Sequence, residues 1–120
     1  MSLPSDPSGL WQQLVLRYPI ETVLAKVRDQ LFNDLERSGC ALPELPEKEP
    51  LYWIPALATS LRSLSSEELN ALLYLVDLPE KWHQHLILSD AYFDQLSEAL
   101  LYRELVKVYY KLHYSDNSSV

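Results

Sequence analysis

The sequence predicts an all-α fold: a single compact helical bundle of five or six helices with a long C-terminal helix. Apolar residues recur at spacings of three and four along the chain, and the strict apolar/polar alternation of β-strands is absent. Leucine alone fills 25 of the 120 positions. A chain of this length can bury one hydrophobic core but is too short for two ordinary domains. We therefore treat residues 1–120 as one helical domain.

The first two helices are predicted on either side of Pro19. Ser8 is expected to cap a short helix that stops near Tyr18, because a residue before proline disfavours the helical conformation. A second helix then starts at Pro19 and ends near Gly39. The apolar residues of this second helix form one stripe: Ile20, Val23, Leu24, Val27, Leu31 and Leu35.

The middle of the chain is predicted to hold a proline-rich connection and three shorter helices. Residues 40–50 contain three prolines and four charged residues, so we expect an ordered connection without a regular element. A third helix follows, with Pro55 in its first turn. Ser65 and Glu68 have the spacing of a capping box, which marks the start of a fourth helix. Pro79 is expected to open a short fifth helix.

The last helix is predicted over residues 90–114, which corresponds to roughly 36 Å. Its acidic residues come early and its basic residues, Arg103, Lys107 and Lys111, come late, an order that complements the helix dipole. The simplest interpretation of these charges is a solvated stripe that stabilises its own helix. Residues 1–7 and 115–120 are predicted to be frayed tails.

Composition excludes several classes of function. The two glycines are isolated from each other, which excludes a P-loop, a Rossmann phosphate turn and a nucleophile elbow. The formal charge of -7 and the pI near 4.8 would repel a phosphate backbone, so we expect no nucleic-acid partner. No apolar run is long enough for a membrane span, and no secretory signal is evident, so we expect a soluble, cytoplasmic protein.

Signals for metal, cofactor or catalytic chemistry are weak. Glu80 and His83 have the Glu-x-x-His spacing found in di-iron bundles, but the motif occurs once. His83 and His85 would point away from each other on a helix. Cys40 follows Gly39 at the expected C-terminal end of a helix, where the dipole disfavours a thiolate. We therefore expect no cofactor, no metal and no catalytic residue.

The C-terminal helix is apolar or aromatic around most of its circumference, so it needs cover on more than one side. One interpretation makes it the central helix of the bundle. In the other, Leu101, Leu105, Val108 and Leu112 face the core, and a second face meets a partner. That second face would consist of Tyr102, Val106, Tyr109 and Tyr110.

Tyr52 and Trp53, beside the proline-rich connection, have two readings as well. They either anchor the connection onto the core or mark a further binding surface.

Together these features favour a non-enzymatic protein–protein interaction module, such as an adaptor, an assembly factor or a small regulator. The expected partner is another protein or a second copy of the chain, which would form a homodimer through the C-terminal helix. The alternative hypothesis is a helical bundle that binds a small apolar ligand or a metal, with or without enzymatic activity. No segment of the sequence carries a recognisable family motif.

Overall fold

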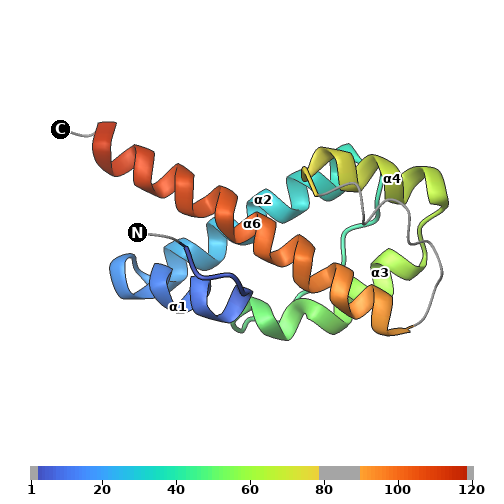
Figure 1. The fold of residues 1–120 in the computed structure, drawn as a ribbon, viewed down its shortest axis with the longest axis horizontal. Helices are drawn as coiled ribbons and strands as arrows, with labels where there is room; N and C mark the ends of the chain where they lie inside the picture. The colour runs from blue at the N-terminus through green and yellow to red at the C-terminus, as the bar shows by residue number, and fades with distance from the viewer. Residues whose placement is uncertain (1–2, 79–89, 119–120) are drawn as a thin grey trace.

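Helix α6 crosses the molecule along its long axis, most of the other helices pack against it, and α4 packs on α2 (Figure 1). The computed structural model describes residues 3–78 and 90–118. The elements in these residues are α1 (Pro7–Arg17), α2 (Ile20–Arg37), the 3₁₀ helix η1 (Pro50–Trp53), α3 (Ile54–Arg62), α4 (Ser66–Leu75) and α6 (Asp90–Ser118). None of the described residues forms a strand, so the predicted all-α bundle with a long C-terminal helix is confirmed. The short helix predicted from Pro79 lies outside the described residues.

Local sequence signals set the ends of the first two helices. The Asp6 side chain caps α1 by accepting a hydrogen bond from the Gly9 amide at 3.2 Å. The cap was predicted at Ser8, but Pro7 is suited to the first helical position and moves the start upstream. Helix α2 ends at Arg37, close to the predicted end near Gly39, and the φ of +79° at Gly39 lets the Cys40 amide donate to the Leu35 carbonyl at 2.9 Å.

The capping box at the start of α4 is present as predicted. The Ser65 side chain accepts from the Glu68 amide at 3.1 Å, and the Glu68 carboxylate accepts from the Ser65 amide at 2.9 Å. The bond from the Ser65 backbone, followed by the bond with its side chain, holds the pKa of Glu68 below its usual value. Both groups are therefore satisfied at a helix end that would otherwise leave them without partners.

Ser65→Ala is expected to lower the free energy of unfolding by about 1 kcal/mol, because the Glu68 amide loses its acceptor. Urea titration of the purified protein measures this change. Ser66→Ala is the matched control, since Ser66 is an exposed neighbour already inside the helix. Equal losses in the two variants would show that the cap does not stabilise α4.

Parts of both segments that were predicted as tails lie among the described residues. The Tyr102 hydroxyl donates to the Pro4 carbonyl at 2.7 Å, and Leu3 packs against the core. The N-terminal segment therefore lies on α6. At the other end α6 continues to Ser118, beyond the expected end at Tyr114.

The core follows the apolar stripes of the helices and centres on α6. Helix α6 packs against α1, α2, α3 and η1. The largest fully buried side chains come from every helix and include Leu10, Leu14, Leu31, Leu35, Trp53, Leu57, Leu61, Leu72, Leu73, Leu96, Leu100 and Leu101. Among the described residues, no helix combines the length and apolar character needed to cross a membrane.

Candidate functional site in the groove between α2 and α6

Helix α6 is covered on several sides, which agrees with the interpretation that made it the central helix. Leu101, Leu105 and Val108 are fully buried, and Leu112 is nearly so. The four residues predicted to face the core therefore do so. Other elements also cover further sides of α6. Less of its surface is therefore free than is needed by the interpretation in which a second face meets a partner.

The four residues predicted as the second face of α6 do not share one exposed surface. Val106 is buried, and Tyr102 is half-buried and tied to Pro4. Tyr109 is half-buried and stacks on His113, with ring centroids 5.9 Å apart. Tyr110 is 48% exposed, and Tyr114, one turn further along α6, is 69% exposed. The most exposed aromatic side chains on this part of α6 are therefore Tyr110, from the predicted set, and Tyr114, which was not in that set.

Tyr52 and Trp53 lie in opposite environments. Trp53 is fully buried, and its indole Nε1–H donates to the Pro46 carbonyl at 3.0 Å. The Arg28 guanidinium lies 5.6 Å from the Trp53 ring. Tyr52 is 59% exposed, with the Lys48 ammonium 5.2 Å from its ring. Trp53 thus anchors the proline-rich connection onto the core, whereas Tyr52 stays at the surface.

The candidate residues for metal or thiol chemistry gain no support from geometry. Glu80 and His83 lie outside the described residues. Within residues 3–78 and 90–118, no three side chains among His, Cys, Asp and Glu form a group that could hold a metal ion. Cys40 is buried, and its burial, together with the negative charge of Glu68, raises the pKa of the thiol.

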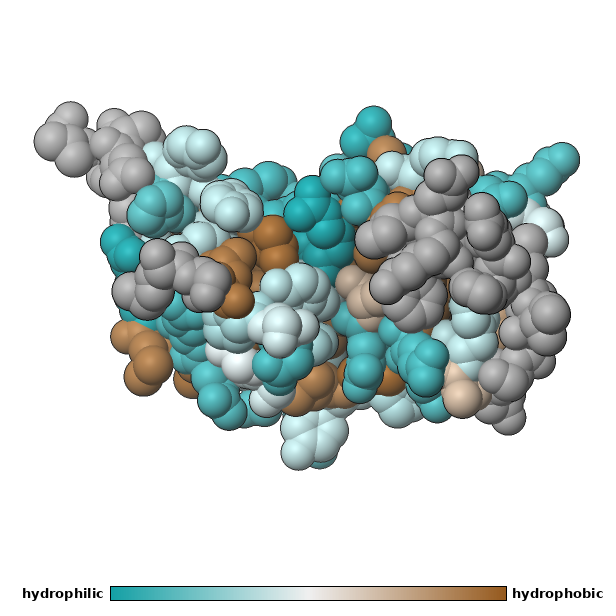
Figure 2. All heavy atoms as spheres, in the orientation of Figure 1, coloured by the Kyte–Doolittle hydropathy of each residue, from teal (hydrophilic) through white to brown (hydrophobic). Residues whose placement is uncertain are grey.

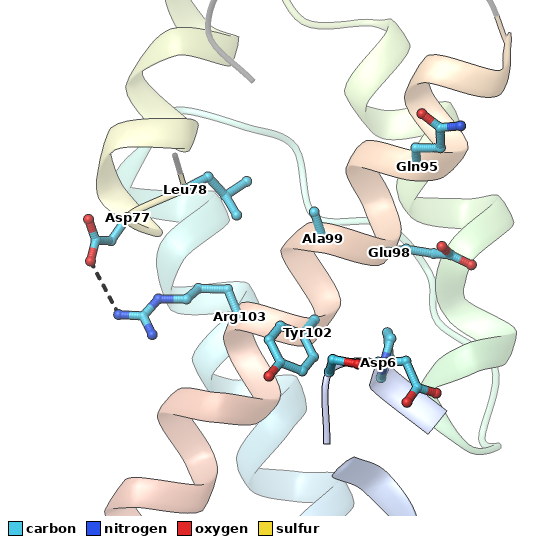
Figure 3. A pocket seen from close by; sticks show the side chains of 10 residues that line it. Asp6, Asp77, Leu78, Gln95, Glu98, Ala99, Tyr102 and Arg103 are labelled. Atoms are coloured by element: carbon cyan, nitrogen blue, oxygen red, sulfur yellow. Dashed lines mark hydrogen bonds and ion pairs between the residues drawn. The ribbon is translucent and has the colours of Figure 1, made fainter. Parts of the chain in front are cut away.

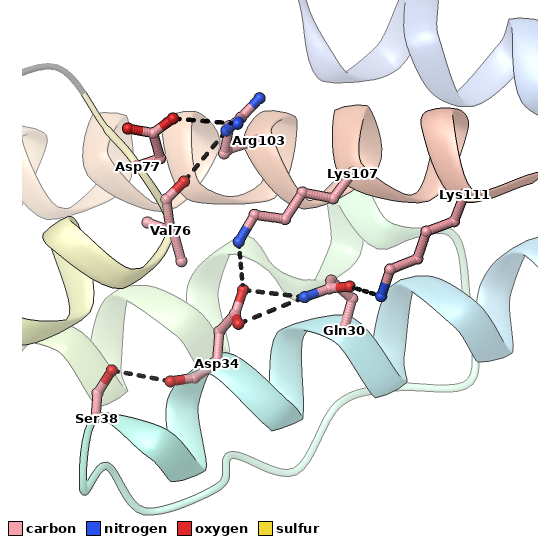
Figure 4. A network of polar contacts seen from close by, with 8 residues as sticks. All are labelled: Gln30, Asp34, Ser38, Val76, Asp77, Arg103, Lys107 and Lys111. Carbon is pink, nitrogen blue, oxygen red and sulfur yellow. Dashed lines mark hydrogen bonds and ion pairs between the residues drawn. The ribbon is translucent and has the colours of Figure 1, made fainter. Parts of the chain in front are cut away.

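The basic residues of α6 contact other elements of the fold: Lys107 and Lys111 contact α2, and Arg103 contacts the end of α4. Arg103, Lys107 and Lys111 form a row along α6 (Figure 4). Lys107 Nζ donates to an Asp34 carboxylate oxygen at 2.9 Å, and Lys111 Nζ donates to the Gln30 side-chain carbonyl. The row therefore makes contacts with another helix, which the interpretation as a solvated stripe did not include.

Arg103, at one end of the row, holds the C-terminal end of α4. Its Nε donates to the Val76 carbonyl at 3.2 Å, and its guanidinium pairs with the Asp77 carboxylate at 3.3 Å. Asp77 has a φ of +63°, the left-handed conformation that often follows a helix. Arg103 thus satisfies a carbonyl that the end of α4 leaves without a helical partner.

Two acidic side chains are buried beneath this row, Asp34 of α2 and Glu104 of α6. Asp34 is 2% exposed and accepts from Lys107 and from the Gln30 amide. Glu104 is fully buried, and neither of its oxygens accepts a hydrogen bond from the described residues. An ionised carboxylate without donors would be costly in that position.

The environment separates the protonation states of the two carboxyl groups. Burial raises the pKa of Glu104 to about 9, and the hydrogen bond and negative charge of Asp34 add to the rise. Burial also acts to raise the pKa of Asp34, but hydrogen bonds from Glu104, Lys107 and Gln30 outweigh it and leave that pKa below its usual value. At neutral pH, these directions leave Glu104 protonated and Asp34 ionised.

An open groove lies over this polar network, between α2 and α6. Its main part has a volume of about 490 Å³, and a second part of about 320 Å³ shares Gln30, Asn33 and Lys111 with it. The side chains that line the two parts include five basic residues, Lys26, Arg37, Arg103, Lys107 and Lys111, and two acidic ones, Asp29 and Asp34. The lining thus has a formal charge of +3 in a chain whose formal charge is -7.

A further pocket, of about 580 Å³, lies on the side of α6 that faces the N-terminal segment (Figure 3). Tyr102, Ala99 and Glu98 come from α6, and Asp6 and Pro7 come from the start of α1. The volume falls within the range of small-molecule sites. Leu78 also lines it, next to residues 79–89, which the structure does not describe.

The fold is an all-α bundle, and the lining of its groove is basic although the chain as a whole is acidic. Comparisons with protein-family models, with curated proteins and with solved structures find no match. The functional interpretation therefore depends on the residues of the groove. One signal for the groove residues was present in the sequence, namely the basic row of α6. No feature of the sequence placed this row opposite Asp34 and Arg37.

Proposed function

We propose that this protein is a non-enzymatic protein–protein interaction module, such as an adaptor, an assembly factor or a small regulator. The partner binds at the groove between α2 and α6 and at the adjacent exposed side of α6. The observation that supports this most is the open basic groove that Tyr110 lines. A large, amphipathic side chain beside charged residues is typical of the centre and rim of protein interfaces.

The exposed surface of α6 is where the proposal differs from the aromatic face expected at first. Three of the expected residues are largely covered by contacts within the chain itself: Tyr102, Val106 and Tyr109. Tyr110 and Tyr114 lie four residues apart, on the same side of the helix. On the face shown in Figure 2, the hydrophobic residues that are coloured lie in small groups among hydrophilic ones.

The test compares association by the wild type and by the double variant Tyr110→Ser/Tyr114→Ser. Light scattering over a range of concentrations reports self-association, and affinity capture reports other partners. We expect the wild type to associate and the double variant to lose that association at an unchanged melting temperature, because both side chains are exposed.

Leu16→Ser is the control, since Leu16 is 88% exposed on α1. Association that survives in the double variant, or that Leu16→Ser removes equally, would contradict the proposal.

The alternative function, binding of a small ligand, has one specific observation in its favour. The pocket beside Tyr102 is large enough for such a molecule. A ligand retained in the native mass spectrum of the purified protein, and released by a substitution at Ala99, would favour this alternative.

A further inference from the structure

We propose that the groove between α2 and α6 binds an acidic segment of a partner protein, with carboxylates spaced about 6 Å apart along an extended chain. This inference rests on the proposed function and adds the chemistry of the partner. The groove supplies the cations, and the partner supplies side chains that match their spacing.

The spacing follows from helix geometry. Arg103, Lys107 and Lys111 are each four residues apart on α6, which places the Cα atoms of successive basic residues about 6 Å apart along the helix axis. The full row is about 12 Å long. In an extended peptide, alternate side chains share one face and lie about 6.6 Å apart. Acidic residues at alternate positions of an extended peptide therefore match the axial repeat of the row.

Some of the positive charges in the groove lining are not neutralised by a neighbouring carboxylate of the described residues. The Asp34 carboxylate pairs with Lys107. The Asp77 carboxylate pairs with Arg103, and the Asp77 side chain is 82% exposed. Lys111 donates to the neutral amide of Gln30, so its charge is not compensated by that contact. Arg37 is exposed in the groove lining. Glu104, beneath the row, carries no charge that would offset these cations at neutral pH.

A protein segment fits this groove better than a nucleic acid or a compact anion. The chain outside the groove is strongly acidic and would repel a phosphate backbone that extended past the 12 Å row. A single small anion would use only one or two of the five cations. Tyr110 and Leu75 in the lining offer apolar surface to the side chains of a peptide.

The test measures the fluorescence anisotropy of a labelled peptide in which glutamate alternates with leucine over about six residues. The same peptide with glutamine in place of glutamate is the ligand control. We expect the glutamate peptide to bind at low salt, to bind more weakly as salt is raised, and to exceed the glutamine peptide in affinity.

Arg37→Gln/Lys111→Gln is the test variant, because both residues are exposed and lie outside the bond between Lys107 and Asp34. It should weaken binding about tenfold. Arg17→Gln/Lys48→Gln is the matched control: it removes one exposed arginine and one exposed lysine from outside the groove lining. The control should retain most of the affinity.

The other outcomes are informative as well. No binding of the glutamate peptide, or equal weakening in both double variants, would overturn the inference. Displacement of the peptide by inorganic phosphate at equal concentration, or tighter binding of a single-stranded oligonucleotide, would overturn the assignment to a protein segment. If the peptide fails while association that depends on Tyr110 and Tyr114 persists, the proposed function stands and this inference alone is wrong. If both fail, both are wrong.

Discussion

Glu104→Gln is expected to raise the free energy of unfolding by about 3 kcal/mol at pH 7. In the folded protein burial raises the pKa of Glu104 from 4.5 to about 9, with a further contribution from Asp34. Keeping this carboxyl protonated at pH 7 costs about 1.4 kcal/mol for each pH unit above 4.5. A glutamine removes that cost, because its side-chain amide is neutral at every pH in this range.

The number of protons bound by the folded and the unfolded chain determines how the stability of the wild type changes with pH. Above pH 4.5 the unfolded chain releases the Glu104 proton, whereas the folded protein keeps it until about pH 9. The folded state binds more protons in this window, so the wild type loses stability as the pH rises from about 4.5 to 9. Glu104→Gln should therefore match the wild type near pH 4 and become progressively more stable than it at higher pH.

Urea titrations at several pH values measure both profiles. Glu98→Gln is the control, because Glu98 lies on the same helix in an exposed position. It should leave the shape of the wild-type profile unchanged. Parallel profiles for the wild type and Glu104→Gln would show that Glu104 is ionised in the folded protein, and would contradict the assignment of the proton.

Trp53→Ala is expected to lower the free energy of unfolding by about 3–5 kcal/mol. The indole is fully buried, donates to the Pro46 carbonyl and lies beside the Arg28 guanidinium. Alanine would leave a cavity and also remove the bond that holds residues 40–50 on the core. A loss of this size is a third or more of the stability of many small domains.

Tyr52→Ala is the matched control for this substitution, since Tyr52 is the adjacent aromatic residue and is 59% exposed. Its effect on stability should stay within about 0.5 kcal/mol. Chemical denaturation followed by circular dichroism compares the two variants. A small effect of Trp53→Ala would contradict the anchoring role of the indole.

Signals that act over a few residues made much of the fold predictable from the sequence. The Ser65 capping box and the stop before Pro19 depend on side chains and backbone groups within four residues. The buried face of α6 follows from helical periodicity. The cap of α1 was misplaced by two residues, because Asp6 and Ser8 are both good capping residues and the position of Pro7 decides between them.

The groove depends on contacts that no local pattern contains. Lys107 and Asp34 are 73 positions apart in the sequence, and Lys111 and Gln30 are 81 apart. Their pairing follows from the antiparallel packing of α6 on α2. Glu104 left a signal, because Leu100, Leu101 and Val108 lie three or four residues away and put position 104 on the buried face.

The central position of α6 has a consequence for synthesis on the ribosome. The chain emerges from its N-terminal side, so α1, α2 and α3 are complete before the helix that covers them exists. Their apolar faces stay without their main partner while residues up to Asp90 and beyond are added. Because the decisive contacts join distant parts of the chain, folding to the final state is expected to be slower than in bundles whose neighbouring helices pair in sequence.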